Sequence, residues 1–103
     1  MTPQDRELLE LAARAARIVT YRSDTGLILR DGAAWNPLTD DGDRYRLARS
    51  VKGNLYFNGS RGAFEIPSDG DGPPILEYFT IGNAEEEGRA IVRAAAESGR
   101  AMG

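Results

Sequence analysis

Apolar side chains recur every three or four positions along the first part of the chain, and this spacing predicts an amphipathic helix over residues 3–17. Thr2 precedes Pro3, so this helix has a polar N-cap and a proline at its first position, where no intrahelical hydrogen bond is lost. Arginine and glutamate occupy the opposite side, which indicates that one face packs on a core. The apolar positions are Leu8, Leu11, Ala12, Ala15, Ile18 and Val19.

Two further helices follow from similar signals. The second is expected to begin in a cluster of aspartates, run to about Val51 and end at Gly53. Asn83 forms a capping box with Glu86 at the start of the third helix, whose expected C-cap is Gly99. The predicted buried stripe of the third helix comprises Gly88, Ile91, Val92 and Ala95.

Stretches rich in β-branched and aromatic residues, separated by turn-forming residues, predict two β-hairpins and one further strand. Residues 67–74 contain only turn formers and are expected to form an exposed loop. The resulting order is α-β-β-α-β-β-β-α, which predicts an α+β fold with three helices on an antiparallel sheet of four to five strands. The expected strands cover residues 18–21, 27–29, 55–57, 63–66 and 75–81.

The composition narrows the classes of function. A chain of 103 residues is expected to form a single domain, residues 1–103. Its net charge of −3 makes direct nucleic-acid binding unfavourable, since domains that bind by bulk electrostatics usually have a pI above about 9. The chain has neither cysteine nor histidine, which excludes thiolate nucleophiles, imidazole bases and zinc sites built on these residues. We therefore expect a protein that is not an enzyme and has no cofactor or metal.

The distribution of apolar residues also predicts a location. The apolar runs are only a few residues long, and the first residues carry no apolar segment typical of a signal peptide. We expect no membrane association and a cytoplasmic protein.

Three aspartates, Asp40, Asp41 and Asp43, are close together in the sequence. Carboxylate oxygens ligate hard cations such as Mg²⁺, so one hypothesis is a metal-dependent hydrolase. The spacing does not match a calcium-binding EF-hand loop, whose ligands are spread more widely. Capping of the second helix explains the same residues without a metal, and we favour that interpretation.

Alternate residues of a strand face opposite sides of a sheet, so Tyr56 and Phe57 cannot both enter one core, nor can Tyr78 and Phe79. If the phenylalanines, including Phe64, face the helices, both tyrosines lie on the opposite face. That face would suit self-association or a protein partner, although single exposed tyrosines are also ordinary on sheets. The acidic neighbours expected beside the tyrosines are Glu65 and Glu77.

Three other residues are candidates for binding. Arg61 lies in a predicted hairpin turn, from which it could contact an anionic ligand or a partner. Trp35 and Asn36 precede a proline, a pattern typical of an aromatic anchor whose neighbour satisfies backbone groups. The alternative for Trp35 is the wall of a small-ligand or peptide pocket.

The residues around Trp35 also carry a resemblance. Residues 35–43 read Trp-Asn-Pro-Leu-Thr-Asp-Asp-Gly-Asp and are followed by Arg46-Leu47-Ala48. This block resembles the signature of small uncharacterised bacteriophage and prophage proteins and, more distantly, of the NinX-like proteins of lambdoid phages. The alanine-rich stretch 85–96 is similar to a second block of that group. Members usually have a small residue after the last aspartate of the block, where this chain has Arg44. The resemblance implies an accessory protein made by a phage inside a bacterium, and it assigns no catalytic or binding residue.

Two classes of function fit these observations. In the first, the chain is a non-enzymatic phage accessory protein that binds and modulates a host or antiviral-defence protein, for example as a CRISPR–Cas inhibitor, and forms a homo-oligomer such as a homodimer. In the second, it is a sponge that sequesters a small anionic nucleotide signal through arginines and aromatic stacking. The candidate binding residues are Trp35, Asn36, Tyr56, Arg61 and Tyr78.

Overall fold

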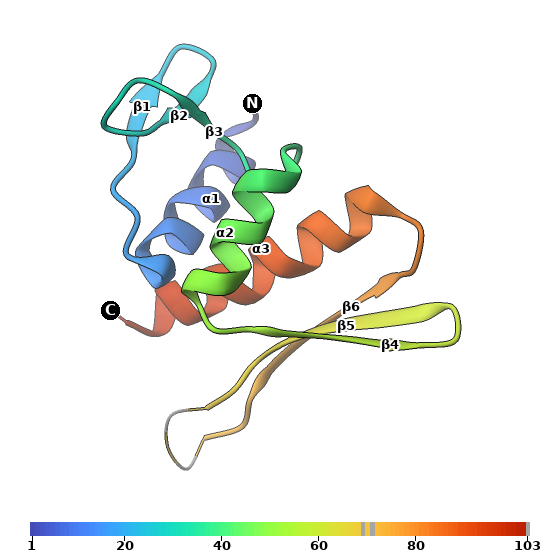
Figure 1. Ribbon diagram of the computed structural model, residues 1–103. Helices are drawn as coiled ribbons and strands as arrows, with labels where there is room; N and C mark the ends of the chain where they lie inside the picture. Colours follow the sequence, from blue (N-terminus) through green and yellow to red (C-terminus); the bar gives the residue numbers. More distant parts are fainter. Residues whose placement is uncertain (69, 71, 103) are drawn as a thin grey trace.

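A computed structural model describes residues 1–68, 70 and 72–102. It is an α+β fold with the element order α-βββ-α-βββ-α (Figure 1). The predicted loop 67–74 includes positions 69 and 71, which lie outside the described residues. The helices are α1 (Pro3–Ala16), α2 (Asp41–Ser50) and α3 (Ala84–Ala101). The first sheet contains β1 (Tyr21–Ser23), β2 (Gly26–Ile28) and β3 (Ala34–Trp35), and the second contains β4 (Asn54–Asn58), β5 (Arg61–Ile66) and β6 (Ile75–Thr80).

The strands form two separate three-stranded antiparallel sheets, so the prediction of one sheet with four to five strands is wrong. Side-chain alternation within a strand predicts which face is buried but does not identify the neighbouring strand. The predicted order also lacked β3, which has two residues and is too short to show alternation. This strand pairs with β2, where Trp35 lies opposite Leu27.

The first hairpin begins at Tyr21 rather than at Ile18, because α1 ends at Ala16 and the amide of Ile18 takes part in closing its last turn. Arg17 adopts a left-handed conformation with a φ of 58°. The amide of Ile18 then donates a hydrogen bond to the carbonyl of Ala13 at 2.9 Å, which closes the last turn of the helix.

The predicted N-caps Thr2 and Asn83 are confirmed, and α2 begins in the predicted aspartate cluster, with Asp40 as its N-cap. The side chains of Thr2, Asp40 and Asn83 each accept a hydrogen bond from the amide three residues later. The end of α2 differs from the prediction, since Lys52 rather than Gly53 has the left-handed backbone. Gly53 serves packing, because a Cβ at this position would lie 2.0 Å from the ring of Phe64.

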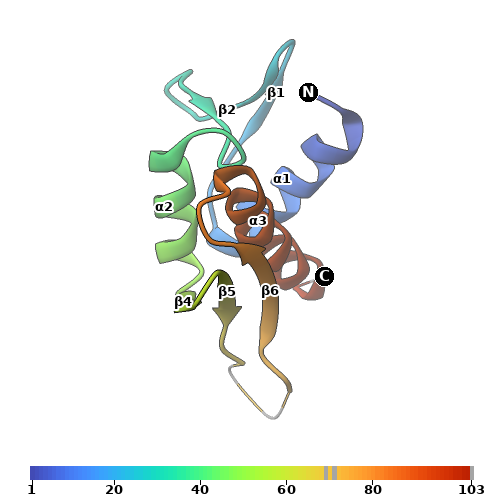
Figure 2. The same ribbon diagram turned by 90° about the vertical axis from the view of Figure 1, so that its right-hand side faces the viewer.

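Helix α3 is the centre of the molecule and contacts α1, α2 and the strands β5 and β6 (Figure 2). Its predicted buried stripe is confirmed, and the helix is buried more extensively than that stripe. Small residues on α3 allow its neighbours to come close. Gly99 is the extreme case and is not the predicted C-cap, because it lies within the helix with its Cα facing α1. A Cβ there would lie 1.9 Å from the carbonyl oxygen of Leu11.

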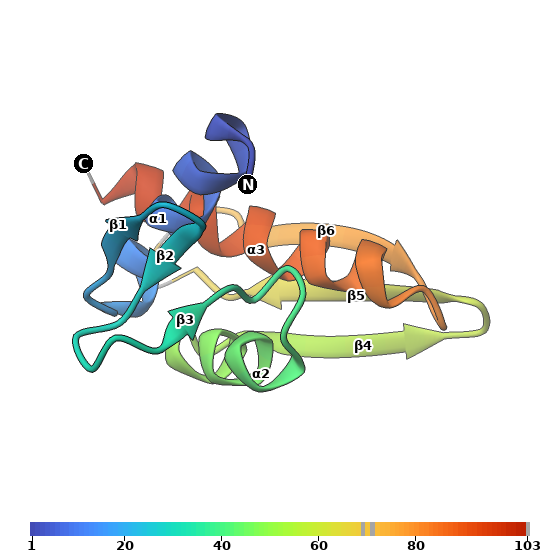
Figure 3. The same cartoon turned by 90° about the horizontal axis from the view of Figure 1, so that it is seen from above.

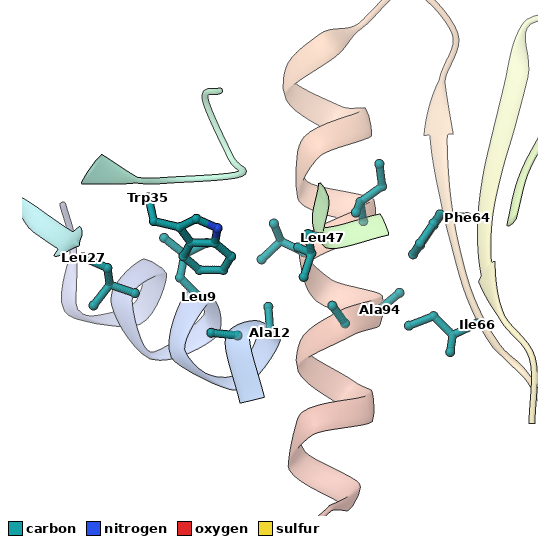
Figure 4. Packing of buried hydrophobic residues seen from close by; sticks show 12 residues of the cluster. Leu9, Ala12, Leu27, Trp35, Leu47, Phe64, Ile66 and Ala94 are labelled. Atoms are coloured by element: carbon teal, nitrogen blue, oxygen red, sulfur yellow. The ribbon is translucent and has the colours of Figure 1, made fainter. Parts of the chain in front are cut away.

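The core extends to both sides of α3 (Figure 4). On one side, Trp35, Leu27 and Leu9 pack between the first sheet and α1. On the other side, Phe64 and Ile66 of β5 face α3. The first sheet therefore packs on α1, and the second sheet packs on α3, with the core residues between them.

None of the helices in the described part of the chain combines the length and the apolar character that a membrane crossing requires.

Candidate functional site

The second sheet has helices on one face only. In register, Tyr56 lies opposite Ala63, and Ala63 lies opposite Tyr78, so the three side chains share the face turned away from α3. No element in the described ranges covers this side, which we call the outer face. The outer face comprises Asn54, Tyr56, Asn58, Arg61, Ala63, Glu65, Leu76, Tyr78 and Thr80.

Two contacts hold the aromatic side chains of the outer face in place. The hydroxyl of Tyr56 donates a hydrogen bond to the carboxylate of Glu65 at 2.9 Å. The guanidinium of Arg61 lies over the ring of Tyr78, with 4.8 Å from its Cζ to the ring centroid. Both tyrosines nevertheless remain about half exposed, at 51% and 55%. They are therefore ordered without being buried, which is favourable for binding because less rotamer freedom is lost on association.

The predicted orientations of the two tyrosines and of Phe57 are confirmed, but the expected place of Glu77 beside the tyrosines is wrong. Glu77 lies opposite Phe64 on the helix-facing side, where it pairs with Arg93 of α3 at 3.6 Å. Phe57 also points to the helix-facing side, yet it is 63% exposed. The reason is that α3 packs on β5 and β6, so that β4 at the edge of the sheet is exposed along its whole length.

The hydrogen bond to Glu65 raises the pKa of Tyr56, because it stabilises the neutral phenol and the adjacent negative charge opposes ionisation. We expect Tyr56 to titrate above the ordinary tyrosine value of about 10, and Glu65→Gln to bring its pKa down toward that value. The pKa of Tyr56 is higher in the folded chain than in the unfolded chain, so its hydrogen bond to Glu65 stabilises the fold fully at a pH below the unfolded-state pKa. This stabilisation is lost as the pH rises through the folded-state pKa.

Carbon-13 NMR of labelled tyrosine rings measures this titration, with the Tyr56 signal assigned by Tyr56→Phe. Tyr21 is the internal control, because it is exposed on the other sheet and its ring signal should be the same in both proteins. An unchanged Tyr56 curve in Glu65→Gln would show that the hydrogen bond does not control the ionisation.

Trp35 and Asn36 are structural. The indole of Trp35 is 2% exposed and packs in the core, which supports the anchor interpretation. Its edge borders an open cavity of about 480 Å³ beside Arg46 and Arg49. The side chain of Asn36 accepts from the amide of Leu38 at 3.0 Å, forming an Asx turn.

The aspartate cluster caps α2 and fastens the preceding loop. Asp40 accepts from the amide of Asp43 at 2.8 Å. The buried carboxylate of Asp43 accepts from the amide of Asn36 at 2.9 Å and from Arg46 at 2.8 Å. Both oxygens of Asp43 are thus engaged by protein donors, and no group of three potential metal ligands lies together in the described ranges. The arrangement favours a capping role over a cation site.

Arg44 is a residue whose role the sequence did not reveal. Its guanidinium is buried and donates to the carbonyls of Pro37 and Leu38, at 3.0 and 2.9 Å, and to the carboxylate of Asp41 at 3.0 Å. It lies flat against Gly88 of α3, where a Cβ would come within 2.6 Å of it. Arg44 thereby ties the loop before α2 to the central helix.

An open cavity of about 690 Å³ lies beside this loop. Arg44 and Arg89 line it, but Arg44 is held by Asp41 and two carbonyls, and Arg89 is paired with Asp5 at 3.1 Å. Glu85 adds a further negative charge. A cavity whose cations already have acidic partners is a poor receptor for an anion.

The chain was also compared with known proteins. No family model, no curated protein and no solved structure matches it.

Proposed function

We propose that the chain is a non-enzymatic binding protein that docks a protein partner on its outer face. In the setting implied by the sequence resemblance, it is a phage accessory protein in the cytoplasm of a bacterial host, and its partner is a host or antiviral-defence protein such as a CRISPR–Cas effector. The observation that carries the proposal is the uncovered outer face, on which Tyr56 and Tyr78 are held in place by Glu65 and Arg61.

The residue types of the outer face fit a protein partner. Tyrosine and arginine dominate the residues that contribute most to binding at protein interfaces, and tyrosine with asparagine is typical of antibody binding loops. Arg61 and Glu65 are the charged residues of the face, and each is already engaged by a tyrosine. The face therefore offers broad aromatic contact area with a few polar groups, as a protein interface requires.

The alternative of a nucleotide sponge has less support. Near Arg61, the available hollow of about 290 Å³ is also lined by Glu86, whose carboxylate would repel a phosphate. The arginines of the open cavity beside the loop before α2 are paired with aspartates. Trp35, one of the residues proposed for stacking, is buried.

The double variant Tyr56→Ser/Tyr78→Ser tests the proposal. Tyr21→Ser is the matched control, since Tyr21 is 48% exposed and lies on the first sheet. The tagged wild-type chain, both variants and the bare tag are incubated with lysate of a host that carries an active CRISPR–Cas system. Each protein retained by the wild type is purified and its Kd measured by titration calorimetry.

We expect the double variant to raise the Kd at least about 30-fold, because the loss of even one interface hot spot costs about 2 kcal/mol or more. The control should bind as the wild type does. In the same host, the wild type and Tyr21→Ser should restore phage plating, and the double variant should not. Equal binding by all three proteins, or restored plating with the double variant, would refute the outer face as the docking site.

A further inference from the structure

Strand β4 is an open edge of the second sheet (Figure 3). All five of its residues are exposed, and along its free side it pairs with no strand of the described chain. Natural proteins usually protect such an edge with charge, proline or a bulge, because unpaired backbone groups attract other strands. The sequence of β4, Asn-Leu-Tyr-Phe-Asn, contains neither charge nor proline, and its register with β5 is regular.

The ladder shows which backbone groups face the open edge. The amide of Ile81 donates to the carbonyl of Ser60 at 2.9 Å, so these two opposite residues are a hydrogen-bonded pair. From this pair onward, non-hydrogen-bonded and hydrogen-bonded pairs alternate along the ladder between β5 and β6. The backbone groups of Arg61, Ala63 and Glu65 therefore point to β4 and pair with those of Asn58, Tyr56 and Asn54. The remaining β4 backbone groups, those of Leu55 and Phe57, point outward.

The strand is also complementary to itself. Its sequence reads nearly the same in both directions around Tyr56, with an apolar residue on each side and an asparagine at each end. A second copy that runs antiparallel on a two-fold axis at Tyr56 places Leu55 opposite the second copy's Phe57, and Asn54 opposite the second copy's Asn58. The outward-facing groups of Leu55 and Phe57 then form the hydrogen-bonded pairs of the new ladder.

The helix-facing side supplies a receptor for Phe57. An open groove of about 300 Å³ between α2, α3 and β4 has Ala48, Leu55 and Ile91 among its apolar lining residues, together with Tyr45. Tyr45 is 62% exposed, and Phe57 is 63% exposed. In the single chain, the Phe57 ring makes an edge-to-face contact with Phe79, with 6.4 Å between the ring centroids. Because Phe57 of one copy lies opposite Leu55 of the other in the two-fold register, a change of its rotamer brings the ring to the mouth of the other copy's groove. Each copy thus provides one aromatic ring and receives one.

From these features we propose that two copies of this chain form a homodimer by antiparallel pairing of their β4 strands, with Phe57 of each copy docked in the groove of the other. The second sheets of the two copies then form one continuous six-stranded sheet, in which the β4 edge is no longer open. This inference goes beyond the proposed function, because it needs no other protein. In the dimer, both outer faces lie on the same side of the continuous sheet, so the proposed binding surface is doubled.

A cross-linking experiment tests the register. The chain lacks cysteine, so Tyr56→Cys introduces a single thiol. On the two-fold axis the two copies of residue 56 form a non-hydrogen-bonded pair with about 4.5 Å between Cα atoms, within reach of a disulfide. Tyr78→Cys is the control on the same face. Five strand spacings would separate its two copies, about 24 Å.

We expect mild oxidation to convert most of Tyr56→Cys to a covalent dimer and to leave Tyr78→Cys monomeric. Equal rates of cross-linking in the two variants would overturn the proposed pairing.

Light scattering during size-exclusion chromatography provides the second measurement. The wild type should have twice its monomer mass of 11.2 kDa. Leu55→Glu/Phe57→Glu should be monomeric, because glutamates then face each other across the new ladder, whereas Leu55→Lys/Phe57→Glu should dimerise more strongly than the double glutamate variant, through opposite charges. Circular dichroism checks that each variant is folded, which is expected because both side chains are exposed.

A wild type that remains monomeric at millimolar concentration would refute the homodimer, and a folded Leu55→Glu/Phe57→Glu variant that is still dimeric would refute pairing through β4. Both measurements use the purified chain alone. Failure of the homodimer therefore leaves the proposed function standing. Tyr56 lies on the proposed two-fold axis, so light scattering of Tyr56→Ser/Tyr78→Ser shows whether a loss of partner binding comes with a loss of the dimer.

Discussion

Replacing Gly99 by alanine is expected to lower the free energy of unfolding by about 3 kcal/mol, at the upper end of the usual cost of overpacking a core. The added methyl group would lie 1.9 Å from the carbonyl oxygen of Leu11, whereas Cβ atoms are essentially never closer than 3.0 Å to another heavy atom. The obstacle is backbone and not a flexible side chain. Helix α1 must therefore move by about 1 Å or more from α3, which disturbs the packing of both.

Urea denaturation followed by circular dichroism measures this effect. Gly70→Ala is the matched control, because a Cβ at Gly70 would have no neighbour within 4 Å. We expect it to leave stability unchanged or to raise it slightly, through the smaller entropy of the unfolded chain. A cost below about 1 kcal/mol for Gly99→Ala would show that α1 and α3 tolerate a wider separation.

Replacing Trp35 by alanine is expected to cost about 3–5 kcal/mol, as for other large aromatic residues in cores. The indole packs with Leu9 and Leu27 and is among the largest fully buried side chains. Its removal leaves a cavity between the first sheet and α1, and it leaves β3 without its main anchor. Total stabilities of domains are about 5–15 kcal/mol, so this variant could lose most of its folded population.

Far-ultraviolet circular dichroism is the suitable probe, since Trp35 is the only tryptophan and its fluorescence is lost in the variant. Tyr21→Ala serves as the control, with an expected change within about 0.5 kcal/mol for an exposed side chain. If Trp35→Ala cost no more than this control, Trp35 would not be the anchor of the first sheet.

The helices and their starts could be predicted from the sequence because the signals are local. Thr2, Asp40 and Asn83 each bond within three residues of their own position, so their surroundings in the sequence are also their surroundings in the fold. The division into two sheets could not be predicted in this way. It depends on contacts between strands, such as Trp35 opposite Leu27, and alternation along one strand does not specify its neighbour.

The glycines illustrate the same limit. A glycine near the expected end of a helix predicts a C-cap. Gly99 instead allows close packing against α1, which lies far away in the sequence. Gly53 likewise makes room for the ring of Phe64. Packing between distant segments gives these residues their roles.

The candidate site was partly predictable. Period-two alternation placed Tyr56 and Tyr78 on one face, since this follows from strand geometry alone. The exposure of Phe57 was not predictable, because it depends on where α3 crosses the sheet. Nor did the sequence predict the buried position of Arg44, because its carbonyl partners become available only when the loop folds against α2.

The contact between α1 and α3 has a consequence for how the chain folds in a cell. Asp5 of α1 and Arg89 of α3 form a partly exposed ion pair although 84 positions separate them. Such long-range contacts form slowly, because the entropy of closing the intervening chain is lost before the contact compensates for it. On the ribosome, α1 is synthesised first and has no partner until α3 has emerged. Its apolar stripe is exposed to chaperones and proteases throughout that interval, so the yield of folded protein depends on how fast the remainder of the chain is translated.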